Sequence, residues 1–174
     1  MISSLRELEA AAALDADLLV QEIAPGTEYT INTFVDSRGQ CLCAVPHARL
    51  EVRGGEVAKA VTCKDRELMN LGRDISEALP GASGPLNVQC FKSPEGRVAV
   101  IEINARFGGG YPLAHRAGAP FTRWIIEQAL GYPISTWFDQ WQDDLAMLRY
   151  DRSVFRHASE LRRTTDVTKA LSGV

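Results

Sequence analysis

The sequence predicts an α+β fold, with a mainly antiparallel sheet and helices packed on one face of it. Several segments alternate apolar with polar residues, which is the side-chain period of a half-buried strand. Short turns that contain glycine join most of these segments, as is typical of hairpins. Other segments carry apolar residues at helical spacing, and no internal repeat divides the 174 residues, so a single domain is expected.

The N-terminal half is expected to form one helix and then four strands. Leucine and alanine recur near helical spacing over residues 5–14, behind Ser3 or Ser4 as the cap. A short apolar run over 18–23 and an alternating run over 29–35 are the first two expected strands. Two more follow glycine-containing hairpin turns and cover residues 41–52 and 57–62.

The C-terminal half is expected to alternate helices with strands. A stripe of leucine and isoleucine over residues 65–79 predicts a helix that Pro80 and Gly81 end. A glycine run at 108–110 separates a second hairpin from two short helical segments. The elements expected after residue 81 are strands over 86–91 and 97–104, helices over 113–117 and 121–130, and a strand over 145–155.

The composition indicates a soluble, cytoplasmic protein. Hydrophobic residues make up 45% of the chain and charged residues 24%, a balance that excludes a disordered chain. The net charge of −3 argues against a non-specific nucleic-acid binder. No apolar run is long enough to cross a membrane, and no basic-then-apolar export signal opens the chain. The four cysteines lack metal-binding spacing, so reduced thiols in the core are expected.

The second hairpin is expected to gather polar side chains on one face. A two-residue turn at 95–96 sets Gln89 opposite Glu102. The same register sets Asn87 opposite Asn104. Moving the register by two residues keeps all four on the same face, because two residues is the side-chain period of a strand.

A cluster of oxygen ligands is therefore expected at Gln89, Glu102 and Asn104. One carboxylate with amide oxygens suits Mg²⁺ or Mn²⁺ rather than zinc or copper. Such a site has little protein charge, so water and substrate phosphates would complete the coordination of the metal. Arg106 and the backbone amides of 108–110 would then neutralise and orient phosphate oxygens. The alternative interpretation is a solvated polar hairpin face without function.

These motifs resemble the ATP-grasp superfamily. The sequences NVQ at 87–89 and IEINAR at 101–106 look like its metal-binding end. The likeness is strongest to the large subunit of carbamoyl-phosphate synthase and to related carboxylate–amine ligases. The sequence VQEIAPGTEYT at 20–30 resembles the hinge strand of the superfamily. The resemblance covers roughly residues 18–116, with a weaker likeness through Phe155.

The resemblance implies a set of site residues. The ligands of a Mg²⁺ (or Mn²⁺) that bridges ATP phosphates would be Gln89, Glu102 and Asn104. The position of Gln89 is often acidic in the wider superfamily, and glutamine lowers the charge of the site. Arg106 would be the catalytic residue, in contact with a phosphate or with the acyl phosphate. The residues that hold adenine and ribose would be Gln21, Glu22, Ile23, Ala24 and Glu28.

Three further basic residues are candidates for the site. His47 and Arg49 share one face of an expected strand, where they could contact a substrate carboxylate or phosphate. The alternatives are a surface histidine and a charge pair between Arg49 and Glu51. The family often places a basic residue near Lys59, but a lysine at a strand edge needs no functional role.

The resemblance also implies an ATP-dependent ligase. Such an enzyme converts a small carboxylate to an acyl phosphate, which an amine or ammonia then attacks. Its ATP site lies between two lobes, and only seventeen residues precede Leu18. We therefore expect residues 1–157 to be the C-terminal lobe and 158–174 a polar tail, inactive without the other lobe.

Alternatives to the ligase remain open. The chain could be a non-catalytic half-domain that binds nucleotide or metal, a subunit of a split enzyme, or a structural module. The missing lobe would come from the parent protein or from a partner chain. Without it, the exposed face would favour homodimerisation or aggregation.

Overall fold

The computed structural model describes residues 2–15, 17–155 and 157–158. Its helices are α1 (Leu5–Leu14), α2 (Arg66–Ala78), α3 (Tyr111–Arg116) and α4 (Phe121–Ala129). Its strands are β1 (Thr27–Val35), β2 (Cys41–Arg53), β3 (Glu56–Thr62), β4 (Gly84–Lys92), β5 (Val98–Asn104) and β6 (Ala146–Leu148). The strands form one sheet in the order β5-β4-β1-β2-β3-β6, and each neighbouring pair is antiparallel. The predicted α+β class is confirmed.

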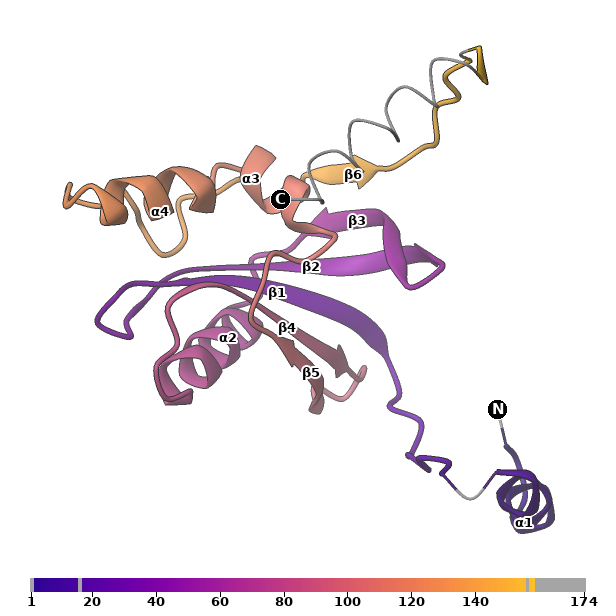
Figure 1. The fold of residues 1–174 in the computed structure, drawn as a ribbon. Coiled ribbons are helices and arrows are strands. Elements are labelled where there is room, and N and C mark those ends of the chain that lie inside the picture. The colour runs from indigo at the N-terminus through magenta and orange to yellow at the C-terminus, as the bar shows by residue number, and fades with distance from the viewer. Residues whose placement is uncertain (1, 16, 156, 159–174) are drawn as a thin grey trace, which may run out of the picture.

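Helices lie on both faces of this sheet, whereas the sequence predicts them on one face (Figure 1). On one face α2 packs so closely that a Cβ at Gly72 would lie 2.6 Å from Ile31 Cγ2. On the other face Phe34 packs against Phe121 and Trp124 of α4, with ring centroids 5.6 and 5.5 Å away. Because neighbouring residues of a strand point to opposite faces, the apolar residues of β1 need cover on both sides.

Two expected strands differ from the structure. Residues 18–23 have no regular secondary structure, and Leu19 and Ile23 are exposed. Among the described residues no strand pairs with this segment, so its backbone has no ladder to join. The strand expected over 145–155 shortens to the three residues of β6. The polar tail expected from residue 158 lies outside the described residues, apart from Ala158.

The core explains the cysteine and tryptophan patterns. Trp124 and Trp141 are buried, whereas Trp137 is about half exposed. All four cysteines are free thiols, and only Cys63 is not fully buried, as the sequence analysis expected of reduced core residues. In the part of the chain that the structure describes, no helix is long and apolar enough to cross a membrane.

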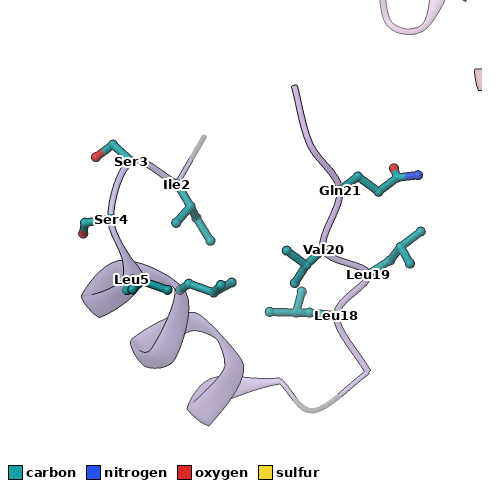
Figure 2. Close-up of a pocket in the computed structure, with 9 residues that line it drawn as sticks. Ile2, Ser3, Ser4, Leu5, Leu18, Leu19, Val20 and Gln21 are labelled. Atoms are coloured by element: carbon teal, nitrogen blue, oxygen red, sulfur yellow. The ribbon is translucent and has the colours of Figure 1, made fainter. Parts of the chain in front are cut away.

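An N-terminal arm carries α1 away from the sheet (Figure 1). None of the residues of α1 is buried, although Ser4 caps it by accepting a hydrogen bond from Glu7 N at 3.3 Å. A groove of about 420 Å³ lies between α1 and residues 18–21. Figure 2 shows that Leu18 and Val20 point into it. No charged side chain lines this groove, so it offers nothing to hold a phosphate or a metal ion.

Candidate functional site

The β4–β5 hairpin gathers the four predicted polar side chains. Gln89 pairs with Glu102, and Asn87 pairs with Asn104, in the register that the sequence predicts. Paired residues of an antiparallel ladder point to the same face, so the four side chains lie together. Thr30 of β1, paired with Gln89, continues the same polar face into the centre of the sheet.

The hairpin reaches this register by a different route from the one expected. The loop contains three residues rather than two, because Ser93 N donates to Arg97 O at 2.9 Å. That extra residue alone would slip the register by one and turn Glu102 to the opposite face. A bulge that leaves Ile101 without a partner restores the register. On the turn side of the bulge Cys90 lies opposite Val100, and on the other side Gln89 lies opposite Glu102.

Gln89 links Glu102 to a half-buried arginine. Its Nε2 donates to Glu102 Oε2 at 3.0 Å, and its Oε1 accepts from Arg49 Nη1 at 3.1 Å. Arg49 also donates through Nη2 to Gly55 O at 3.0 Å, and its Nε lies 3.2 Å from Glu28 Oε1. The oxygen of Gln89 is therefore already used, and it could bind a cation only after Arg49 releases it.

The glycine run 108–110 packs against three polar side chains. A Cβ would overlap Asn87 at Gly108, Glu56 at Gly109 and His47 at Gly110. None of the three glycines has a positive φ, so the site needs glycine for space and not for backbone conformation. Among the described residues, the backbone N–H groups of this run have no hydrogen-bond acceptor. The run therefore brings unpaired donors close to the polar face of the sheet.

A small cavity of about 50 Å³ lies between the glycine run and the sheet. Its lining consists of Thr30, Arg49, Gly55, Glu56, Val57, Asn87, Gln89, Arg106 and Gly108–Gly110. Buried polar atoms without a partner among the described residues cluster around it, namely Asn87 Oδ1, Asn104 Nδ2 and His47 Nε2. Unpaired buried polar groups are costly in a folded protein, so their clustering points to a missing polar ligand.

His47 contributes a donor to this cluster. Burial, and secondarily the charge of Arg49, lowers the pKa of the imidazole from 6.5 to about 3, so the ring is neutral at pH 7. Asn32 Nδ2 donates to His47 Nδ1 at 3.2 Å. That bond makes Nδ1 the acceptor and leaves the proton on Nε2, which faces Gly110.

A larger cavity of about 630 Å³ lies on the other side of Glu102. It is lined by Gln21, Glu22, Ala24, Phe91, Ala99, Val100, Ile101 and Glu102. Gln89 lines the small cavity and Glu102 the large one, so the hydrogen bond between them lies at the boundary. The large cavity combines apolar β4–β5 side chains with the N-terminal segment, whereas the small one is almost wholly polar.

The structure brings most of the predicted site residues together. Of these residues, Gln89, Arg49 and Arg106 line the small cavity, and Arg106 Nη1 donates to Phe107 O at 3.2 Å. Glu102 lines the large cavity, and Asn104 lies opposite Asn87 in the hairpin. Of the residues predicted to hold adenine, Ile23 is exposed and lines neither cavity. Glu28, predicted to hold ribose, is half-buried against Arg49. Lys59 pairs with Glu51 at 2.5 Å and lines neither cavity. It does not lie at a sheet edge either, because its strand β3 pairs with β2 on one side and with β6 on the other, where Lys59 is opposite Leu148.

Three site residues were not assigned from the sequence. Asn87 could have been assigned from the sequence, because it lies two residues before Gln89 and therefore on the same face of the strand. Glu56 and Arg149 had none, because they meet across 93 positions of sequence.

The residues present fit a hard cation that is coordinated partly by protein oxygens and partly by phosphate oxygens. Among the described residues, no three histidine, cysteine or acidic side chains gather, so the protein supplies little charge for a metal. Glu102 offers its second carboxylate oxygen, and the buried Asn87 Oδ1 is unpartnered. Mg²⁺ is commonly held by one or two carboxylates and completed by water and phosphate oxygens, which matches this donor set.

Comparison with protein families identifies the chain. A family model described as ATP-grasp in the biosynthetic pathway with Ter operon matches residues 15–151, which is more than half of the sequence. The chain belongs to this ATP-grasp family. A comparison of the sequence with curated proteins finds no significant match.

Several solved structures share the fold of this chain. The ADP complex of purK, N5-carboxyaminoimidazole ribonucleotide synthetase, has a TM-score of 0.60 at 11% identity and covers 79% of this chain and 38% of its own. The biotin carboxylase subunit of pyruvate carboxylase has a TM-score of 0.58 at 15% identity, covering 72% and 30%. The L-amino acid ligase from Bacillus licheniformis has a TM-score of 0.53 at 19% identity, covering 79% and 36%. The chain therefore spans about a third of the length of these proteins.

Proposed function

We propose that this chain is the C-terminal lobe of an ATP-dependent carboxylate–amine ligase. The observation that carries the proposal is the position of the Gln89–Glu102 hydrogen bond between two cavities of different character. The larger, partly apolar cavity suits a nucleotide base, and the small donor-rich cavity suits phosphate oxygens. A nucleotide that spans both would place its phosphates beside Glu102.

The side chains around the small cavity would divide the work of holding these phosphates. Glu102, with Asn87 and Asn104, would hold Mg²⁺ or Mn²⁺, which when bound neutralises charge on the phosphate oxygens. Arg49 and Arg106 would contact the phosphates as cations. His47 would donate from its neutral Nε2, and the glycine run would donate from its backbone.

The proposed chemistry joins a small acid to an amine. A carboxylate oxygen of the acid bonds to the γ-phosphorus while the bond from that phosphorus to ADP breaks. The amine nitrogen then bonds to the acyl carbon, phosphate leaves, and the nitrogen loses a proton. In such a reaction the protein acts mainly by positioning the reactants and stabilising charge, and the donors around this cavity would serve that purpose. The amino acid ligase and biotin carboxylase among the structural neighbours support this reaction class.

The rest of the ATP site would come from a second lobe, in the parent protein or in a partner chain. The chain covers only about a third of its structural neighbours, and residues 18–23 expose apolar side chains without a strand partner in the described structure. A second copy of the chain on this face is the alternative. Reduced cysteines and the use of ATP favour a cytoplasmic location.

Calorimetric titration with ADP, in the presence and absence of Mg²⁺, tests the proposal. We expect Mg²⁺-dependent binding that Glu102→Ala abolishes and Glu95→Ala retains, because Glu95 is an exposed carboxylate at the tip of the same hairpin. Titration with Mn²⁺, followed by electron paramagnetic resonance, reads the metal site without requiring the base to bind. Equal Mn²⁺ affinity in the wild-type protein and in Glu102→Ala would overturn the assignment.

A second candidate function is a nucleotide-binding module without catalysis. It is favoured by the single free carboxylate of the site and by the engagement of the Gln89 oxygen with Arg49. Measurement of ADP release with the second lobe supplied separates the two functions. A module of this kind would bind MgADP but release none from ATP in the presence of acids and amines.

A further inference from the structure

Arg149 reaches the candidate site from the far edge of the sheet. It directly follows β6, and its backbone N–H donates to Ala58 O of β3 at 2.8 Å. This bond fixes the start of the side chain next to the β2–β3 hairpin. From there the guanidinium extends to the glycine run, where it forms two hydrogen bonds.

These two hydrogen bonds hold the middle of the glycine run. Arg149 Nη2 donates to Gly109 O at 2.7 Å, and Nη1 donates to Glu56 Oε2 at 3.1 Å. The Glu56 carboxylate is also the group against which Gly109 packs without a Cβ. Because the guanidinium is planar and rigid, it fixes the Gly109 carbonyl relative to the carboxylate.

The orientation of one peptide group follows from these contacts. The structure has no cis peptide bond among its described residues, so the carbonyl of Gly109 and the N–H of Gly110 point in opposite directions. With the carbonyl on Arg149, the N–H of Gly110 points away from Arg149. Gly110 lines the small cavity and Arg149 does not, and this N–H has no acceptor among the described residues.

The contribution of Arg149 to overall stability is expected to be small. Its side chain is 40% exposed and that of Glu56 is 63% exposed. Exposed ion pairs of this kind typically contribute about 0–1 kcal/mol to folding. The contacts of Arg149 therefore act mainly on the local geometry of the glycine run.

We propose that Arg149 is a positioning residue that holds the Gly109–Gly110 peptide so that its N–H is presented to an anion in the small cavity. The identification of that anion as a nucleotide phosphate rests on the proposed function. Arg149 thereby couples the strand at one edge of the sheet to the cavity over its central strands. Lysine could replace only one of its two hydrogen bonds at a time.

Two NMR measurements on the full chain test this proposal, with Arg149→Ala, Arg149→Lys and Arg53→Ala as variants. Arg53 is a matched control, because it is an exposed arginine of the neighbouring hairpin that pairs with Glu51 instead. The first measurement is the hydrogen exchange of the Tyr111 and Leu113 amides, which bond to Gly108 O and Gly110 O. The second is the shift of the Gly110 amide resonance when MgADP is added.

We expect Arg149→Ala to speed exchange at Tyr111 and Leu113 by roughly tenfold, a loss of about 1.4 kcal/mol in local protection. The amides of the core strands should be unchanged. The variant should also lose the shift of Gly110 on addition of MgADP and bind MgADP roughly tenfold more weakly. The exchange rates and MgADP affinity of Arg149→Lys should lie between those of Arg149→Ala and those of the wild-type protein. Arg53→Ala should match the wild-type protein in both.

Unchanged exchange at Tyr111 and Leu113 in Arg149→Ala would overturn the positioning role, whatever the ligand does. Faster exchange throughout the core would also overturn it, because Arg149 would then support the whole fold. If exchange changes locally while the wild-type protein fails to bind MgADP or inorganic phosphate, the positioning of the peptide stands and the proposed nucleotide function fails.

Discussion

Gln89 is hydrogen bonded to Arg49 and to Glu102 at the same time, through opposite ends of its amide. The oxygen accepts from Arg49 Nη1 at 3.1 Å, and the nitrogen donates to Glu102 Oε2 at 3.0 Å. A positive partner on one side and a negative partner on the other permit only this orientation of the amide. Gln89 therefore aligns Glu102, and it keeps the guanidinium and the carboxylate from pairing directly.

Replacing Gln89 by glutamate should make the protein depend on a divalent cation. Gln89→Glu would set a second carboxylate against Glu102 while its other oxygen keeps the contact with Arg49, so the net repulsion should cost about 1 kcal/mol of folding free energy without metal. Mg²⁺ would relieve this repulsion, so it should raise the Tm of the variant more than that of the wild-type protein. Thermal unfolding with and without Mg²⁺ measures the effect.

The double variant Gln89→Glu with Glu102→Gln is the matched control. It has the same number of carboxylates as the wild-type protein and should respond to Mg²⁺ as the wild-type protein does. An equal Mg²⁺ response in Gln89→Glu and in the wild-type protein would contradict the placement of a cation beside Glu102.

Gly110→Ala should destabilise the protein through a specific collision. The added Cβ would overlap the His47 imidazole, which is completely buried and cannot move aside. Overpacking of this kind typically costs about 1–3 kcal/mol. The second substitution His47→Ala should recover part of the loss by making room, and urea unfolding of the two single variants and the double variant measures the coupling. Strictly additive effects would show that the collision does not occur.

The hairpin site could be predicted from the sequence because its chemistry follows a period of two. Any even error in the register leaves Gln89 and Glu102 on the same face. The true loop is longer by one residue, and this alone would turn Glu102 to the face opposite Gln89. The bulge at Ile101 cancels that error, and nothing in the local sequence signals the bulge.

The parts that could not be predicted depend on distant contacts. Arg149 and Glu56 meet only because β6 joins the edge of β3, so neither residue has a local signal. Residues 18–23 show the opposite failure, because their apolar run predicts a strand although strand formation requires a neighbouring strand. The segment has no such neighbour among the described strands.

The cysteines should differ sharply in their reaction with iodoacetamide. Burial raises the pKa of Cys41 to about 12 and that of Cys90 to about 11, and it raises that of Cys43 as well. Because the thiolate is the reactive form, these three thiols should react only after unfolding. Cys63 is partly exposed and should react first in the folded protein, although its pKa is also raised by burial. Mass spectrometry after a timed reaction would contradict this prediction if it found rapid labelling of Cys41 or Cys90.

His47 should make the protein less stable in acid. Burial lowers the pKa of its imidazole from 6.5 to about 3 in the folded protein. The unfolded chain therefore gains a proton as the pH falls below 6.5, while the folded protein does not gain it until about pH 3. The stability due to the neutral ring is fully present above pH 6.5, and it is lost as the pH falls from 6.5 to about 3. Between pH 7.5 and pH 5 the loss should be about 2 kcal/mol.

The variant His47→Gln isolates this contribution from that of other titrating groups. Glutamine does not titrate, whereas the carboxylates and the remaining histidines contribute equally to both proteins. Urea unfolding at pH 7.5 and pH 5 should therefore show a stability loss for the wild-type protein that exceeds the loss for the variant by about 2 kcal/mol. If both proteins lost the same amount, His47 would be protonated in the folded state. The imidazole would then be a cation beside the cavity, and the assignment of a neutral Nε2 donor to the phosphate site would be wrong.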